Sequence, residues 1–99
     1  MPLAALTFAM HHPAFVGHFP GRPIVPGVLL LDGAQRAVET ATGLVLTGLA
    51  AAKFLSPAVP GDALVLEYDV AESTVRFEIR CGLRKISSGS FLIAAAPRS

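Results

Sequence analysis

Cysteine is almost missing from this sequence: Cys81 is the only one, which excludes an internal disulfide. Nothing in the cysteine usage indicates an oxidising compartment, so we expect a reducing cytoplasm. Long apolar runs are missing as well. The longest, such as residues 44–52, fall well short of the about 20 residues that a membrane-spanning helix needs. Residues 1–13, MPLAALTFAMHHP, lack the early positive charges of a secretory signal, and we interpret them as part of the fold.

Charge is also scarce. Charged residues make up 15% of the chain and hydrophobic residues 53%. This composition argues against disorder and predicts an apolar face that a further chain covers, so we expect an oligomer. The eight basic and seven acidic residues give a net charge of +1, with no basic run of the kind that follows phosphates. Nucleic acid is therefore not an expected partner.

Prolines and glycines divide the chain, which at 99 residues has the size of one domain, 1–99. They crowd residues 11–27, which predicts a shaped loop of the kind that is usually functional. Pro26 can begin a helix and Gly43 can end one. One long helix over about residues 27–42 is therefore predicted, and its apolar first turns suggest that it is the buried centre of the domain.

The rest of the chain has the period of β-strands. Residues 64–70 and 75–81 alternate apolar and polar side chains, which places Cys81 among small core residues. Strands are predicted at residues 3–10, 45–55, 64–70, 75–81 and 91–95, with turns at 56–62 and at Ser87-Ser88-Gly89. The fold class is α+β, an antiparallel sheet of about five strands with one helix.

Asp32 is unexpected, because it interrupts the apolar run VLLLDGA inside the predicted helix. A buried carboxylate costs several kcal/mol unless it is paired, hydrogen bonded or protonated. A structural hydrogen bond, to an amide of a neighbouring loop or to Arg36 one turn later, is one explanation. A catalytic carboxyl is the other, since such costly groups gather at active sites. His18 is the natural second member of such a site, because the loop at residues 11–27 leads to the start of the same helix.

The stretch GHFPGRPIVPGVLLLD resembles the signature of the bacterial β-hydroxyacyl-acyl carrier protein dehydratases. FLSPAVPGDALVLE is similar to the strand, loop and strand that follow the helix in that family, so the resemblance covers nearly the whole chain. It implies the hotdog fold, in which an antiparallel sheet wraps round one long helix. It also implies a homodimer, or an assembly of dimers, in which the histidine and the acid of each site come from different protomers.

The resemblance assigns His18 to the catalytic histidine and Asp32 to the catalytic acid of the family. Gly27 and Val28 fall where backbone amides receive the thioester carbonyl of the substrate. The implied reaction converts (3R)-hydroxyacyl thioesters on acyl carrier protein to trans-2-enoyl thioesters, in fatty acid or related specialised acyl and aryl-polyene synthesis. It requires no metal and no organic cofactor.

The sequence departs from the family pattern in three places. Asp32 is typical of the branch that includes double-bond isomerases, whereas the loop before it looks like the branch with Glu. His11-His12 replaces the usual Asn-Glu, and since neighbours on an extended chain face opposite ways, we expect no metal site there. Many members place a helix and a strand before the first strand, and the sequence does not show them, so we expect either one edge of the sheet or the mouth of the substrate tunnel to be less covered.

Two other functions are compatible with the pattern. Hotdog folds also host acyl thioesterases, although those resembling hydrolases lack the His-Phe-Pro-Gly loop. The chain could instead be a catalytically silent acyl-binding subunit that pairs with a longer partner, but the presence of both His18 and Asp32 argues against this. Arg22, Arg36 and Lys53 are weak candidates for contacts with an acidic carrier protein.

Overall fold

A computed structural model describes residues 2–6 and 24–94 of the chain. Within these ranges no helix has the length and apolar character needed to cross a membrane. The predicted strand at residues 3–10 is confirmed over its first part, and residues 7–10 lie outside the described ranges. In chain order the elements are β1 (Leu3–Leu6), α1 (Gly27–Thr42), β2 (Leu46–Phe54), β3 (Leu64–Val70), β4 (Thr74–Cys81) and β5 (Arg84–Ile93).

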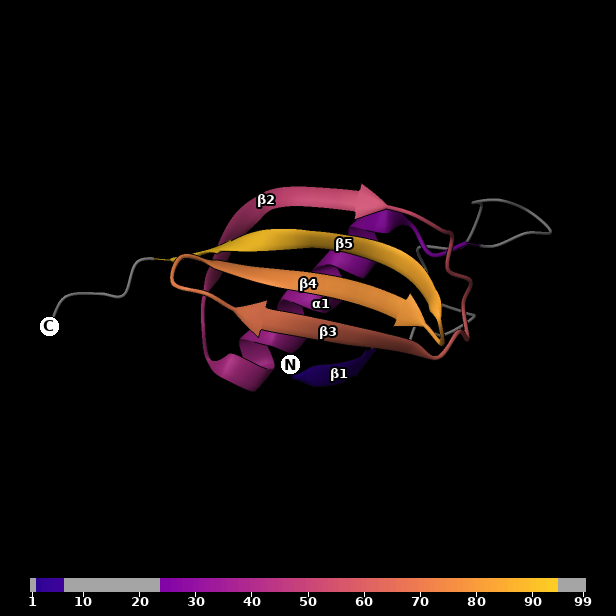
Figure 1. The fold of residues 1–99 in the computed structure, drawn as a ribbon, viewed down its shortest axis with the longest axis horizontal. Coiled ribbons are helices and arrows are strands. Elements are labelled where there is room, and N and C mark those ends of the chain that lie inside the picture. Colours follow the sequence, from indigo (N-terminus) through magenta and orange to yellow (C-terminus); the bar gives the residue numbers. More distant parts are fainter. Residues whose placement is uncertain (1, 7–23, 95–99) are drawn as a thin grey trace, which may run out of the picture.

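The five strands form one antiparallel sheet in the order β1-β3-β4-β5-β2. The helix α1 lies across one face of the sheet, behind the strands in Figure 1, and the long strands curve over it. The predicted α+β architecture, an antiparallel sheet with one helix, is therefore confirmed. The helix has 16 residues, so its predicted position is confirmed, whereas its description as long is not.

The residues that flank α1 explain its bounds. Pro26 is the N-cap, with φ −57° and ψ 143°, and a proline there needs no amide partner. Gly43 has φ 75°, the left-handed conformation that glycine adopts readily, and its amide donates to the carbonyl of Glu39 at 2.9 Å. The helix predicted over residues 27–42 is confirmed at both ends.

Only one stripe of α1 is buried. Leu30, Ala34 and Val38, spaced one turn apart, pack in the core of the domain. On the other side, the side chain of Val28 is 72% exposed. The prediction that this helix is the buried centre of the domain therefore holds for one face of the helix only, because a helix that lies on one sheet has one covered face.

The sheet face toward α1 is apolar and supplies the rest of the core. The alternation predicted along residues 64–70 and 75–81 is confirmed, and Cys81 packs partly buried against the core. The buried side chains of β3, β4 and β5 include Leu64, Leu66, Tyr68, Val75, Phe77, Ile79, Ile86 and Phe91.

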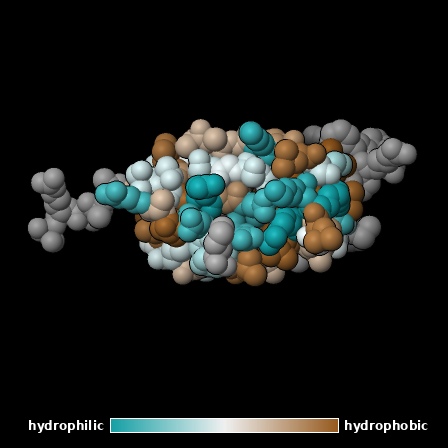
Figure 2. All heavy atoms as spheres, viewed as in Figure 1, coloured by the Kyte–Doolittle hydropathy of each residue, from teal (hydrophilic) through white to brown (hydrophobic). Residues whose placement is uncertain are grey.

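The opposite face of the sheet is polar. Figure 2 shows this face, with hydrophilic side chains gathered in a band across the strands. Arg80 pairs with Glu67 at 2.7 Å, and Lys85 pairs with Glu78 at 3.4 Å. The domain thus has one apolar and one charged sheet face, as the alternating strands predict.

The connection between β4 and β5 differs from the prediction. A two-residue turn, Gly82-Leu83, joins these strands, and Gly82 has φ 61°, which suits the first position of a hairpin turn. The predicted turn at residues 87–89 is wrong, because these residues lie inside β5. Ser87 is fully buried there, and its hydroxyl donates to the carbonyl of Lys53 at 2.8 Å, so the polar group is satisfied within the sheet.

Candidate active site

The first amides of α1 have no partner within the helix. The carbonyl of Pro26 accepts hydrogen bonds from the amides of Leu29 and Leu30, at 3.0 and 3.3 Å. The amides of Gly27 and Val28 precede these two and are therefore not used by the helix itself. The first turn has no acidic residue and no side-chain cap. This end of α1 presents the positive end of the helix dipole, which suits a developing negative charge.

An apolar cavity of about 400 Å³ opens beside this end of the helix. The start of α1, with Gly27 and Leu30, forms one wall. The end of β2 and the segment that follows it, with Phe54, Leu55 and Ala58, form another. The cavity therefore offers an apolar group a place next to backbone amides that the helix itself does not use.

Phe54 and Gly27 meet at this cavity. A Cβ atom at Gly27 would lie only 2.7 Å from Cζ of Phe54, so the ring rests where a glycine leaves room for it. The side chain of Phe54 is nevertheless 56% exposed. Phe54 was not predicted as a site residue, because alternation along a strand does not reveal which residue ends beside the helix start.

Asp32 lies on the exposed side of α1. Its carboxylate pairs with Nε of Arg36 at 3.1 Å, and the side chains of Asp32 and Arg36 are 52% and 78% exposed. Asp32 is two residues from both Leu30 and Ala34, which places it about 200° around the helix from each. The predicted desolvation of Asp32 is therefore wrong for the single chain, and the expected pair with Arg36 is present. The catalytic role of Asp32 stays a prediction.

The structure brings together only part of the predicted site. Gly27 lines the cavity, whereas Val28 and Asp32 do not. His18 lies outside the described residues, as do His11 and His12, so the geometry between His18 and Asp32 stays a prediction.

A second hollow, of about 570 Å³, lies over β3, β4 and β5, where charged side chains such as Glu67 and Glu78 line it. These two carboxylates pair with Arg80 and Lys85, and Gly27, Val28 and Asp32, the predicted site residues that the structure describes, do not line this hollow. Within residues 2–6 and 24–94, no three His, Cys, Asp or Glu side chains gather in a way that could hold a metal ion. The candidate site is therefore the cavity at the start of α1.

Two sequence comparisons relate the chain to known dehydratases. A family model described as ApeI-like, ApeI dehydratase, matches residues 3–90. A 3-hydroxyacyl-[acyl-carrier-protein] dehydratase FabZ from Ehrlichia chaffeensis is 37% identical over 85 residues, covering 76% of this chain and 59% of that protein. The chain spans about half the length of the curated relatives it matches.

Solved structures agree with this relationship. The dehydratase heterocomplex ApeI:P from Xenorhabdus doucetiae is similar with a TM-score of 0.80 and 26% identity, over 94% of this chain and 86% of that chain. The fluoroacetyl-CoA thioesterase FlK is similar in fold alone, with a TM-score of 0.69 and 18% identity, over 94% of this chain and 82% of that chain. The resemblance inferred from the residues around His18 and Asp32 is confirmed at the level of the family: the chain belongs to the ApeI-like dehydratases.

Proposed function

We propose that this chain dehydrates (3R)-hydroxyacyl thioesters on acyl carrier protein to trans-2-enoyl thioesters, in the cytoplasm, for fatty acid or related specialised acyl synthesis. The observation that carries the proposal is the apolar cavity beside the first amides of α1, which the helix itself does not use, in a member of a dehydratase family. The cavity would hold the acyl chain of the substrate, and the amides would bind its thioester carbonyl. The carrier is inferred from the FabZ relative, whose name specifies acyl carrier protein.

Loss of water from such a thioester has three chemical requirements. A base must remove the weakly acidic C2 proton, and we assign this to the imidazole of His18, since histidine is the side chain that most often acts as a general base. Negative charge on the thioester oxygen must be stabilised, which the amides of Gly27 and Val28 do at the positive helix end. The departing 3-hydroxyl must gain a proton, and we assign this to Asp32, directly or through a held water. The route needs no metal or organic cofactor.

Asp32 lies on the exposed side of α1, where its carboxylate pairs with Arg36. Asp32 does not line the cavity of its own chain, so it can serve a reaction only where a second chain covers that side of α1. Members of the resembling family take the acid and the histidine of one site from different protomers. We therefore propose that Asp32 completes the site of a partner chain, in a dimer that buries the exposed side of α1 and changes the surroundings of Asp32.

The strand β2 offers the surface for such a dimer. It lies at one end of the sheet, and among the strands of residues 2–6 and 24–94 it pairs with β5 alone. It carries a single charged residue, Lys53, among nine. Leu49 is 43% exposed on it. A long, apolar edge strand is a template for pairing with another chain. β1, at the opposite end of the sheet, is only 4 residues long in the described ranges, so β2 is the better candidate.

We expect Leu49→Lys to shift the protein from dimer to monomer, because it places a charge on the apolar edge that the second copy would cover. Analytical ultracentrifugation at several concentrations measures this shift. Leu83→Lys is the matched control, since Leu83 is fully exposed at the turn between β4 and β5, outside the proposed interface. A wild-type protein that stays monomeric at high concentration would contradict the homodimer.

Another role is favoured by one observation: the similar ApeI:P structure from Xenorhabdus doucetiae is a dehydratase heterocomplex. This chain would then be an acyl-binding subunit that is active only beside a different, related chain. Thioester hydrolysis has weaker support, because the similarity to the thioesterase FlK concerns the fold alone. The reaction of the purified chain alone separates these alternatives from the proposed dehydratase. An acyl-binding subunit would not react with the thioester, and a thioesterase would hydrolyse it.

Incubation of the purified protein with 3-hydroxyacyl thioesters, on acyl carrier protein and on a pantetheine mimic, tests the function. Mass spectrometry should detect the loss of one water from the (3R) substrate and none from the (3S) substrate. Release of free thiol without dehydration would indicate a thioesterase instead. No reaction across several chain lengths would contradict independent dehydration and favour the silent subunit.

A further inference from the structure

The segment between β2 and β3, residues 55–63, forms one wall of the cavity but belongs to no strand. Its position therefore depends on contacts with other elements. One of these comes from β5, where the carbonyl of Ile86 accepts hydrogen bonds from the amides of Leu55 and Ser56, at 2.9 and 3.3 Å. These two bonds hold the start of the segment beside β5. The residues after Ser56 need other contacts to fix their position.

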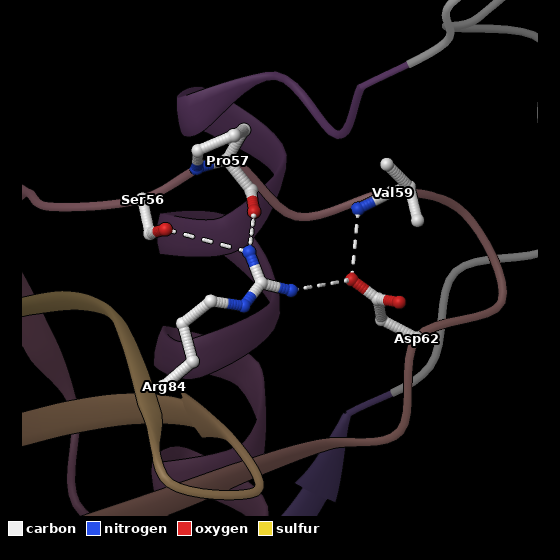
Figure 3. A network of polar contacts seen from close by, with 5 residues as sticks. All are labelled: Ser56, Pro57, Val59, Asp62 and Arg84. Atoms are coloured by element: carbon white, nitrogen blue, oxygen red, sulfur yellow. Dashed lines mark hydrogen bonds and ion pairs between the residues drawn. The ribbon is translucent and has the colours of Figure 1, made fainter.

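Arg84 holds the middle and the end of the segment. One nitrogen of its guanidinium, Nη1, donates to the carbonyl of Pro57 at 2.6 Å and to the hydroxyl of Ser56 at 3.4 Å. The other, Nη2, contacts Oδ2 of Asp62 at 3.4 Å. The same carboxylate oxygen accepts the amide of Val59 at 3.0 Å. Figure 3 shows the guanidinium between Pro57 and Asp62, where its planar fork joins two points of the turn at once.

The segment is connected in turn to the start of α1. Ala58, which is fully buried between Pro57 and Val59, accepts a hydrogen bond at its carbonyl from the amide of Val25 at 2.7 Å. Val25 is also buried and directly precedes the N-cap Pro26. A displacement of the segment therefore moves both a wall of the cavity and the residues that lead into the helix end.

We propose that Arg84, together with Asp62, is a positioning residue for the reaction: it holds the segment so that the cavity wall and the first amides of α1 keep their places around the thioester. This inference rests on the proposed dehydration. Arg84 itself lies outside the cavity lining and acts through Pro57 and Ala58.

The Arg84–Asp62 pair is partly exposed, so its role in positioning the segment can be tested apart from a role in folding. The side chains of Arg84 and Asp62 are 46% and 20% exposed, and ion pairs near the surface contribute little to the stability of a fold. The bonds from Ile86 remain when Arg84 is replaced. A variant should therefore stay folded while the segment loses its fixed position.

The test compares Arg84→Gln with the wild-type protein in steady-state dehydration. We expect kcat to fall about 10- to 100-fold, because small displacements of groups that meet the reacting atoms have effects of this size. KM should change much less, since the amides interact most strongly with charge that develops in the transition state. Arg84→Lys keeps one donor and should recover part of kcat. Lys85→Gln is the matched control, because Lys85 pairs with Glu78 outside the segment.

A second readout keeps this inference separate from the proposed function. Amide hydrogen exchange at Val25 and at Val59 should be faster in Arg84→Gln and unchanged in Lys85→Gln, whether or not the protein is a dehydratase. If the wild-type protein does not dehydrate, the proposed function fails and exchange alone decides whether Arg84 holds the segment. An active wild type with an unchanged kcat in Arg84→Gln overturns the positioning role, and so does unchanged exchange.

Discussion

Asp32→Asn should lower the rate of dehydration by about 10²- to 10⁴-fold, the usual contribution of a general acid, in a protein that remains folded. The amide keeps the shape of the carboxyl but has no acidic proton. Its effect on the stability of the single chain should be small, because Asp32 is exposed there and its pair with Arg36 is of the i,i+4 kind, worth about 0.3–0.5 kcal/mol. Single-turnover rates, measured beside thermal unfolding, check both expectations.

Arg36→Gln decides between the two explanations of Asp32. It removes the same ion pair and leaves the carboxyl in place. If Asp32 serves only as the partner of Arg36, the two variants should behave alike and keep their activity. If Asp32 is catalytic, Arg36→Gln should stay active while Asp32→Asn does not, and Asp32→Glu should keep part of the rate because the resembling family uses either acid.

The same assay on His18→Ala should show a loss of similar size, since His18 is proposed as the base. Mixing inactive Asp32→Asn with inactive His18→Ala adds a test of sharing between chains. In a dimer that takes one group from each protomer, mixed dimers contain one intact site, so exchange of subunits should restore part of the activity. No recovery after confirmed exchange would mean that both groups act from the same chain.

Local signals in the sequence were enough to predict the helix and most strands. Pro26 and Gly43 each have one strong local role, at a helix start and a helix end, so the bounds of α1 were predictable. The alternation along β3 and β4 made their inward faces predictable in the same way.

The sequence could not show which other element or chain covers each face of the helix α1. The run around Asp32 is apolar, which suggested burial, but Asp32 and Val28 lie on the side of α1 that this chain leaves exposed. Whether a second chain covers that side is a property of the assembly. The run is therefore consistent with burial between chains, although it was wrong as a prediction for one chain.

Contacts between residues that are far apart in the sequence could not be predicted either. Asp62 was interpreted as part of a turn, which its bond to the amide of Val59 bears out, but its pairing with Arg84, 22 positions away, has no local signal. The residues at 87–89 were interpreted as a turn because serine and glycine favour turns. These residues instead belong to β5 and pair with β2, and the short distance between the two strands there is not visible in the local sequence.

At Gly89, β2 lies so close to β5 that we expect an added side chain to have a large effect on the stability of the fold. A Cβ atom on Gly89 would overlap the carbonyl oxygen of Ala51 in β2 and lie 2.9 Å from Cζ of Phe77 in β4. We expect Gly89→Ala to destabilise the fold by about 3 kcal/mol, at the upper end of overpacking, because the carbonyl belongs to the backbone and cannot turn aside. For a chain of this size each kcal/mol lowers Tm by about 4–8 °C.

Gly48→Ala is the control for Gly89→Ala, since Gly48 lies in β2, on the same strand pair, and its added Cβ would meet nothing within 4 Å. Neither glycine has a positive φ, so the two changes differ in the space available and not in backbone strain. Gly48→Ala should leave Tm unchanged or raise it slightly, by restricting the unfolded chain. If both variants lose the same stability in urea unfolding, loss of glycine itself is responsible and the close packing of β2 against β5 is not. A loss confined to Gly89→Ala would mean that the absence of a side chain there lets the edge strand approach, and with it the Phe54 end of the cavity.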